Sequence, residues 1–437
     1  MSKKLHLVSL GCTKNLVDSE VMLGRLKEYE ITDDNTEADV IIVNTCGFID
    51  AAKEESINTV LNLHDERKKD SILVMSGCLS ERYKEELQAD MPEIDIFTGV
   101  GDYEKIDELI ASKQSTFSPE VYLATETSGR VITGSNYHAY VKIAEGCNQA
   151  CSFCAIPSFK GKLHSRSLTS IVKEVTNLVA QGFHDFSFIS QDSSSYGRDM
   201  ELKDGLIDLI KAIESIEGIK SARILYLYPS TTTFELIDAI SDSDIFQTYY
   251  DMPIQHIDDT VLKTMKRGFG EKKTIELLEY MKSKPNAFLR TSVIAGHPGE
   301  SEESFQKLCN FMKTFEFDRF NTFHYSNEET TTAYTMEQVS QDIIDERAEI
   351  LGEIAEASTL SSLKKMLGQT VTIVIDGESD EHEYLLSARP LMWAVDIDGE
   401  LLVNDTSNLP IAYGKTYKAK ITELVGMQLL CTLLKKL

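Results

Sequence analysis

The stretch Glu145-Gly-Cys-Asn-Gln-Ala-Cys-Ser-Phe-Cys154 carries the most specific signal in this 437-residue chain. Its three cysteines have the spacing Cys147-x3-Cys151-x2-Cys154, and the loop follows a predicted strand at 139–143. Three thiolates in one tight loop can hold three irons of a [4Fe-4S] cluster and leave the fourth iron open to a substrate. A zinc site that borrows His164 is the weaker alternative, because zinc loops more often use C-x2-C pairs.

The chain around this loop alternates between strands and helices. Six apolar or β-branched runs within 136–366 are predicted strands, with amphipathic helices between them. One helix places Ile171, Val175 and Leu178 on one face and ends near Gly182. Six strand–helix units predict a partial (β/α)6 barrel with its chemistry at the carboxyl ends of the strands. The predicted strands lie at 139–143, 185–189, 222–226, 248–252, 288–294 and 319–324.

Upstream, residues 1–115 predict a separate N-terminal domain with a doubly wound parallel sheet. Its expected strands lie at 5–10, 39–44, 71–76 and 94–98, and Cys12, Cys46 and Cys78 each come directly after one of the first three. Parallel strands bring these cysteines to one edge of the sheet, so they are predicted ligands of a second three-thiolate cluster. Cys309 and Cys431 lie in a predicted helix and strand, and we expect them to be core residues.

Downstream of the N-terminal domain, residues 116–135 are rich in Ser, Thr, Gly and Glu and are interpreted as a linker. A long helix is expected over 338–367, where the central domain closes. From 367 to 437 the pattern changes to period two, which predicts a small antiparallel β-barrel. Its five expected strands lie at 371–375, 384–388, 400–403, 417–421 and 428–432.

Composition limits the classes of function. The chain has 44 basic and 70 acidic side chains, a formal net charge of -26. This charge argues against sequence-blind capture of nucleic acid, which depends on Lys and Arg neutralising phosphates. No apolar run approaches the ~20 residues of a membrane span, and the amino terminus lacks a signal-peptide pattern. We therefore expect a cytoplasmic protein, in which clustered cysteines indicate metal or redox chemistry rather than disulfides.

The cysteine loop, its place after the first barrel strand and the aromatic Phe153 resemble the radical S-adenosylmethionine enzymes. The resemblance implies that Cys147, Cys151 and Cys154 hold a [4Fe-4S] cluster whose open iron chelates the amino and carboxylate groups of S-adenosylmethionine. One electron from the cluster then cleaves the sulfonium to a 5'-deoxyadenosyl radical. Phe153 matches the aromatic position beside the adenine.

The same resemblance suggests further cofactor contacts. Gln191 and Asp192 follow the second strand, where the family usually has a Gly-Gly-Glu-like motif at the methionyl amine; this sequence departs from that motif. Gly296, after the fifth strand, matches the family's adenine-side loop, where a glycine would let the backbone approach a ligand. An ordinary βα turn is the alternative for each. No role is assigned to the other polar residues at strand ends, which are Gln255, His256, His324 and Tyr325.

The whole chain resembles the methylthiotransferases, which combine a three-cysteine N-terminal domain, a radical S-adenosylmethionine barrel and a C-terminal TRAM-type β-barrel. The resemblance implies two [4Fe-4S] clusters. One S-adenosylmethionine supplies a methyl group to sulfur at the auxiliary cluster, and a second is cleaved to abstract hydrogen from an unactivated carbon. It also implies an electron donor and a sulfur source as partners, and no membrane.

Two branches of this family differ in substrate. The segments at 9–19, 44–52 and 154–166 resemble the branch that modifies the β-carbon of an aspartate in the twelfth protein of the small ribosomal subunit, although Thr13 stands where the pattern has Pro. Residues 367–437 carry ten acidic and six basic side chains, which favours a basic ribosomal protein over tRNA. A tRNA adenosine methylthiotransferase and a non-catalytic iron-sulfur or metal-binding module stay open as alternatives.

Overall fold

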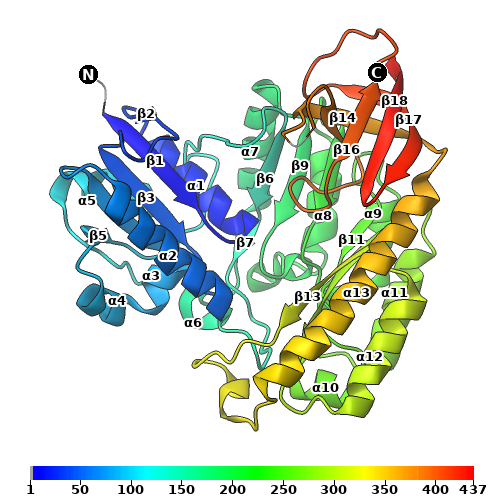
Figure 1. The fold of residues 1–437 in the computed structure, drawn as a ribbon, viewed down its shortest axis with the longest axis horizontal. Coiled ribbons are helices and arrows are strands. Elements are labelled where there is room, and N and C mark those ends of the chain that lie inside the picture. Colours follow the sequence, from blue (N-terminus) through cyan, green and yellow to red (C-terminus); the bar gives the residue numbers. More distant parts are fainter. Residues whose placement is uncertain (1–2, 381) are drawn as a thin grey trace.

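Three units follow one another along the chain in the computed structural model, which describes residues 3–380 and 382–437 (Figure 1). An N-terminal α/β unit lies beside a central unit of parallel strands and helices, and a small red barrel lies at the carboxyl end. The predicted α/β fold class with these three architectures is confirmed. The exact domain boundaries stay a prediction.

The N-terminal sheet is parallel, with strand order β2-β1-β3-β4-β5. This order reverses direction between β1 and β3, and open α/β sheets bind ligands in the crevice at such a point. Cys12 follows β1 and Cys46 follows β3, so the fold places both beside that crevice. The strands are β1 (Lys4–Ser9), β2 (Glu30–Ile31), β3 (Val40–Thr45), β4 (Ile72–Gly77) and β5 (Ile96–Phe97); the helices are α1 (Thr13–Arg25), α2 (Asp50–Glu66), α3 (Cys78–Arg82), α4 (Lys84–Asp90) and α5 (Ile106–Ser112), with a 3-10 turn η1 (Tyr103–Lys105).

The central unit contains the six predicted parallel strands. They pair as β10-β9-β6 and β11-β12-β13, and the hydrogen bond from Leu227 N to Asp251 O (2.8 Å) joins the two sets into one partial barrel. A short hairpin of β7 (Ala144–Glu145) and β8 (His164–Ser165) encloses the cysteine loop. The main strands are β6 (His138–Lys142), β9 (Asp185–Ile189), β10 (Ser221–Ile224), β11 (Tyr249–Asp251), β12 (Phe288–Ala295) and β13 (Arg319–His324).

The helices of the central unit cover the outside of these strands (Figure 1). In α7, the Ser167 hydroxyl caps the first turn, and Phe183 N donates to Leu178 O (3.1 Å) beyond the last turn. Gly182 is the residue directly after the helix cap and has φ +103°. A glycine adopts this left-handed conformation without strain, which suits the end of a helix. The helices are α6 (Ile156–Lys160), α7 (Leu168–Ala180), α8 (Gly205–Glu214), α9 (Phe234–Ser241), α10 (Asp259–Thr264), α11 (Glu271–Lys282), α12 (Glu302–Phe315) and α13 (Gln341–Met366), and the 3-10 turns are η2 (Ser193–Ser195), η3 (Arg198–Met200), η4 (Pro229–Thr231) and η5 (Thr332–Thr335).

The C-terminal barrel is closed in the order β14-β15-β16-β18-β17. Its strand pairs are antiparallel except for β16 and β18. These two run parallel because the chain reverses direction twice between them, once into β17 and once out of it. Cys431 is buried in this barrel and Cys309 is buried in α12, as expected for core residues. The strands are β14 (Thr370–Glu378), β15 (Leu386–Pro390), β16 (Leu401–Asp405), β17 (Thr416–Val425) and β18 (Gln428–Lys436).

Asp185 joins this barrel to the central unit. Its buried carboxylate, at the start of β9, pairs with Arg223 (3.1 Å) and with Arg389 of the small barrel. Burial by itself would raise the pKa of Asp185, but the two guanidinium groups hold it well below its usual value. The small barrel therefore docks at the amino end of β9, away from the cysteine loop after β6. Within the described residues, no helix is long and apolar enough to span a membrane.

We expect Asp185→Asn to lower the free energy of unfolding by about 3–5 kcal/mol, because two buried guanidinium groups lose their carboxylate. Denaturant unfolding can be followed by the fluorescence of Trp393, the only tryptophan of the chain, which is buried beside Arg389. Asp208→Asn, at an exposed position of α8, is the matched control and should change stability by less than about 0.5 kcal/mol. Equal midpoints for the two variants would contradict this role of Asp185.

Candidate functional site

The upstream cysteines lie at the ends of β1, β3 and β4, and the glycine before Cys12 shows how closely two of these loops approach. Gly11 has φ +81°, and a Cβ there would lie 2.6 Å from the Cβ of Cys46 and 2.8 Å from its sulfur. Asn15 Nδ2 donates to Leu10 O and Thr45 O, each at 3.1 Å. Cys78 Sγ lies 3.5 Å from Asn15 Oδ1, so this one side chain contacts all three loops.

Burial controls the protonation of two of these thiols, Cys46 and Cys78. It raises the pKa of Cys46 to about 11, with a further contribution from Cys12, and it raises the pKa of Cys78 still more. Cys12 opposes ionisation of both Cys46 and Cys78, which is the setting in which a bound cation is needed to hold thiolates together. The donor set therefore fits a thiolate-ligated metal cluster.

The Cys147–Cys154 loop is held by backbone hydrogen bonds at both ends. Cys147 N donates to Gly161 O (3.1 Å), and Ser152 N donates to Met265 O (3.0 Å). Burial raises the pKa of Cys147 and Cys154 to about 12, and neighbouring thiols contribute to both shifts. This loop thus presents a second, half-buried thiol-rich site of the same chemical kind.

Cys151 has two partners from other barrel loops. Arg267 Nη1 donates to its sulfur (3.4 Å), and the hydroxyl of Tyr228 lies 3.6 Å away. The guanidinium of Arg267 also stacks 4.2 Å from the ring centroid of Tyr228. No three Cys, His, Asp or Glu side chains in the described part of the chain already converge tightly enough to hold a metal ion, so the six ligand assignments stay a prediction.

Among the predicted cofactor contacts, Phe153 and Gln191 lie close to the loop. Phe153 packs edge-on against His297, with ring centroids 6.1 Å apart, and His297 hydrogen-bonds Ser152 (2.9 Å). Gln191 Nε2 donates to Glu145, two residues before Cys147. Both side chains therefore border the cysteine loop, while their contact with a cosubstrate stays a prediction.

Asp192 and Gly296 each have a structural role that the sequence did not indicate. The Asp192 carboxylate caps η2 and accepts from Ser195 N (3.2 Å) and from Gln149 Nε2 (2.8 Å), which ties the cysteine loop to β9. Gly296 has φ +81°, and a Cβ there would lie 2.3 Å from Ile344 Cγ1. The packing of α13 therefore requires a glycine here, and its place beside a cosubstrate stays a prediction.

The two histidines at strand ends that received no role from the sequence lie in different environments. His256 is buried 3.4 Å from Glu300, whereas His324 is exposed 3.5 Å from Asp345. His164, the ligand of the zinc alternative, is exposed on β8.

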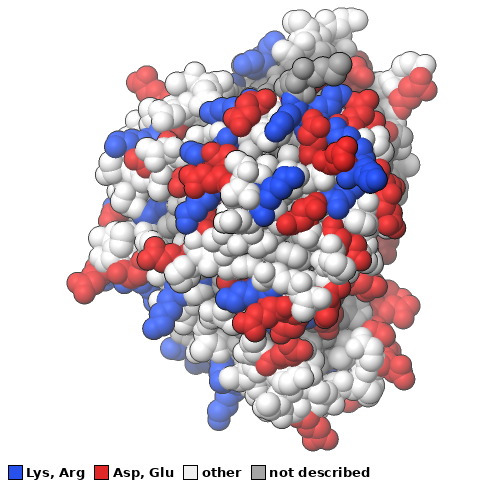
Figure 2. All heavy atoms as spheres, turned by 90° about the vertical axis from the view of Figure 1, so that its left-hand side faces the viewer, with Lys and Arg blue, Asp and Glu red and all other residues white. Residues whose placement is uncertain are grey.

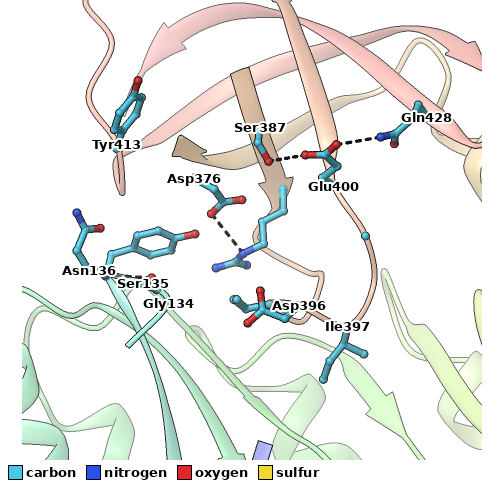
Figure 3. Close-up of a pocket in the computed structure, with 14 residues that line it drawn as sticks. Gly134, Ser135, Asn136, Asp376, Ser387, Asp396, Ile397, Glu400, Tyr413 and Gln428 are labelled. Carbon is cyan, nitrogen blue, oxygen red and sulfur yellow. Dashed lines mark hydrogen bonds and ion pairs between the residues drawn. The ribbon is translucent and has the colours of Figure 1, made fainter. Parts of the chain in front are cut away.

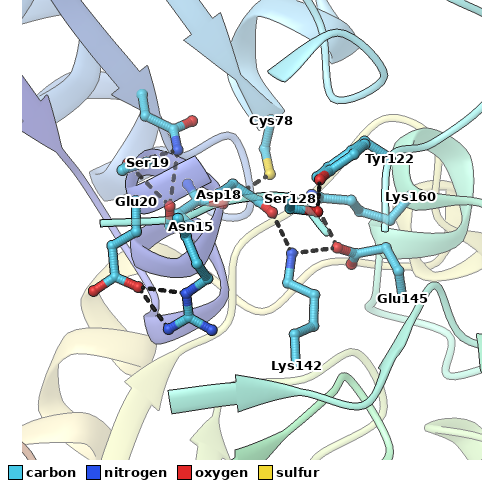
Figure 4. Close-up of polar contacts among 12 residues, drawn as sticks. Asn15, Asp18, Ser19, Glu20, Cys78, Tyr122, Ser128, Lys142, Glu145 and Lys160 are labelled. Carbon is cyan, nitrogen blue, oxygen red and sulfur yellow. Dashed lines mark hydrogen bonds and ion pairs between the residues drawn. The ribbon is translucent and has the colours of Figure 1, made fainter. Parts of the chain in front are cut away.

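A buried group of lysines and carboxylates lies near Cys78 and includes Glu145, two residues before Cys147; sequence reasoning missed it (Figure 4). Lys142 Nζ lies 2.5 Å from Asp18 and 2.7 Å from Glu145, and Lys160 Nζ lies 3.5 Å from each. All four side chains are almost fully buried. Burial would raise the pKa of Glu145, but Lys142 and Lys160 hold it at about 2. Asp18 belongs to α1 and the others to the central unit, so no local pattern could signal the group.

A second contact between the units involves Glu328, which follows β13. Its buried carboxylate pairs with Arg82 (2.6 Å) and Lys53 (3.1 Å) of the N-terminal unit. Arg82 Nη1 also donates to Gly47 O (2.9 Å), directly after Cys46. The central unit therefore supports the backbone beside an upstream cysteine.

Comparison with known proteins agrees with this architecture. Three family models match in chain order: "Uncharacterized protein family UPF0004" at residues 4–99, "Radical SAM superfamily" at 141–312 and "TRAM domain" at 367–433. The chain is 88% identical to the ribosomal protein uS12 methylthiotransferase RimO of a Sulfurovum species, over 99% of both chains. It is 64% identical to the protein of the same name from Aliarcobacter butzleri, over 99% of this chain and 98% of that one.

This chain belongs to the uS12 methylthiotransferase (RimO) family. The expected membership of the methylthiotransferases is therefore confirmed. Among solved structures, the radical S-adenosylmethionine methyltransferase TsrM from Kitasatospora setae has a TM-score of 0.56 at 15% identity and covers 76% of this chain and 74% of its own. At that identity the likeness concerns the fold alone, and it agrees with the central barrel of this RimO family member.

We expect Gly11→Ala to remove iron from the N-terminal site and leave the barrel site loaded, because the new Cβ displaces Cys46. Anaerobic reconstitution followed by iron analysis should give about four irons per chain instead of about eight. Gly182→Ala is the matched control: it has the same backbone strain at φ +103°, but nothing lies within 4 Å of its Cβ. About eight irons in both variants would be inconsistent with a ligand role for Cys46.

Proposed function

We propose that this chain installs a methylthio group on the β-carbon of an aspartate in ribosomal protein uS12, using two [4Fe-4S] clusters and S-adenosylmethionine. The observation that carries the proposal is the presence of two three-thiol groups, one at the ends of β1, β3 and β4 and one in the Cys147–Cys154 loop, linked by the Lys142 ion pairs. The relatives named uS12 methylthiotransferases cover essentially the whole chain, which supports this enzyme activity over a non-catalytic metal module.

The residues present fit the cofactors of such a reaction. Cys147, Cys151 and Cys154 would hold the cluster that, with S-adenosylmethionine bound, supplies a radical able to open a C–H bond lacking an acidic proton. Cys12, Cys46 and Cys78 would hold the auxiliary cluster. Cys46 and Cys78 are buried, and Tyr228 and Arg267 lie against the half-buried Cys151, so part of each site is shielded from bulk water. Phe153, Gln191, Asp192 and Gly296 are the proposed cosubstrate side of the pocket.

The charge distribution supports a basic protein substrate. The C-terminal barrel borders a cavity of about 930 Å³ whose lining includes Asp376, Asp396 and Glu400 around Arg389 (Figure 3). Asp376 lies 3.9 Å from Arg389, and with Asp396 and Glu400 the lining carries three carboxylates against this one guanidinium, so the cavity is acidic on balance. A polyanion such as tRNA would be repelled by this lining.

The outer face of the N-terminal unit agrees with this preference. Figure 2 shows basic and acidic side chains intermingled there, so this face offers no uniformly basic surface to a phosphate backbone. We propose that the protein acts in the cytoplasm on uS12, either free or in the small subunit. An electron donor and a sulfur source complete its proposed partners.

The substrate is tested by offering anaerobically reconstituted enzyme uS12 and tRNA in parallel, with S-adenosylmethionine and a reductant. We expect uS12, and not tRNA, to gain the mass of one methylthio group. The modified residue can be located by fragmentation of the peptide. Modification of tRNA with unmodified uS12 would refute the proposed substrate.

The division of labour between the clusters predicts opposite behaviour for two cysteine variants. Cys151→Ala should abolish formation of 5'-deoxyadenosine. Cys46→Ala should still form it, because the barrel site is intact, but should lose methylthiolation. Cys309→Ala, in the core of α12, is the control and should retain both products. Chromatography of the nucleoside and mass spectrometry of uS12 measure the two outcomes. A full yield of modified uS12 from Cys46→Ala would overturn the two-cluster assignment.

A further inference from the structure

Lys14 has a largely buried side chain whose ammonium has no counterion in the described part of the chain and keeps some access to solvent. It lies on the first turn of α1, two residues after Cys12, and its side chain is only 9% exposed. Its ammonium lies 3.4 Å from the ring centroid of Tyr226, a cation–π contact. Among the described residues its ammonium has no hydrogen bond or ion pair besides this contact. An ammonium that is unpaired, fixed on a mostly buried side chain and still accessible is placed to receive an anionic ligand.

The nearby carboxylates do not fill this role. Glu145 and Asp251 are close enough to act electrostatically on Lys14. However, Glu145 pairs with Lys142 and accepts from Gln191. Asp251 pairs with Arg290 (2.8 Å). Both are engaged by other donors, so the ammonium is left free for a group from outside the chain.

Tyr226 is held in an uncommon conformation beneath this ammonium. It follows β10 with φ +63°, which is costly for a bulky residue and is typical of functional sites. Tyr226 N donates to Asp251 Oδ2 (3.0 Å), and Tyr226 O accepts from Ser193 N (2.9 Å). Its hydroxyl lies 3.4 Å from Thr13 Oγ1. The barrel therefore supports a strained backbone that presents an aromatic ring to Lys14.

The Lys14–Tyr226 pair lies where the reacting carbon would have to be held. Lys14 belongs to the helix that begins directly after the auxiliary ligand Cys12, and Tyr226 lies at the carboxyl end of a barrel strand. A target carbon must meet a radical formed at the barrel site and sulfur held at the auxiliary site, so it has to lie between the two. The Lys14–Tyr226 contact bridges these two edges.

We propose that the Lys14 ammonium, supported by Tyr226, binds the side-chain carboxylate of the aspartate that is modified. This inference rests on the proposed function and deepens it. In aspartate the carboxylate carbon is bonded directly to the β-carbon, so a charge-assisted hydrogen bond to the carboxylate places the β C–H bond. Asparagine has the same shape without the charge, and a site built on an unpaired ammonium discriminates against it.

The test measures binding of uS12 to anaerobically reconstituted enzyme, with the native substrate and with a substrate whose target aspartate is changed to asparagine. Wild-type enzyme should bind the aspartate form more tightly, by about tenfold or more. Lys14→Met should bring the ratio of the two dissociation constants close to one. Lys14→Arg, which keeps the charge, should retain a preference for aspartate. Lys27→Met, at an exposed position near the end of α1, is the matched control and should behave like wild type.

Two further measurements separate this role from other roles of Lys14. Iron content and the KM for S-adenosylmethionine in 5'-deoxyadenosine formation should be unchanged in Lys14→Met. A raised KM would assign the ammonium to the cosubstrate carboxylate, and a loss of iron would assign it to the cluster; either result overturns the proposal. An undiminished preference for aspartate in Lys14→Met overturns it as well. Failure of wild-type enzyme to bind or modify either form of uS12 would instead refute the proposed function itself, and the inference with it.

Discussion

The ammonium of Lys142, buried between Asp18 and Glu145, is the interaction on which the arrangement of this molecule depends. It is completely inaccessible to solvent, and it joins α1 to the strand that leads into the Cys147 loop. Removing one partner of such a group leaves an uncompensated buried charge, at a cost of about 3–5 kcal/mol. The two cysteine sites are therefore held in one relative position by charge pairing rather than by apolar contact alone.

Both cysteine sites are built by the same local device. At Gly11 and Gly77 a parallel strand ends, a glycine with positive φ turns the backbone and a cysteine follows; Gly146 does the same after the short antiparallel strand β7. A side chain at any of these glycines would meet neighbouring atoms within 3 Å. The backbone beside these cysteines is thus tightly packed, which restricts where their thiols can lie.

The balance of acidic and basic side chains differs between the whole molecule and the space between the cysteine sites. The formal charge of -26 is distributed over the molecule as a whole, yet the space between the cysteine sites holds three buried lysines, Lys14, Lys142 and Lys160. Two carboxylates, Asp18 and Glu145, compensate two of these charges. An acidic exterior favours a basic protein as partner. The cationic interior between the cysteine sites favours the binding of anionic groups there.

The sequence by itself determined the strands, the three architectures and the six clustered cysteines, because strand periodicity and cysteine spacing are local properties of the chain. It did not reveal that α13 occupies the space over Gly296, that Asp192 caps a turn, or that β16 and β18 run parallel, because each depends on segments distant in sequence. Only the tertiary structure decided which charges are buried together: Asp18 and Lys142 are 124 residues apart, and Lys14 meets Tyr226 across the two units. Ion pairs form between residues that are distant in sequence, so they produce no periodic pattern along the chain. The location of the site was therefore predictable from the sequence, but the arrangement of its charges was not.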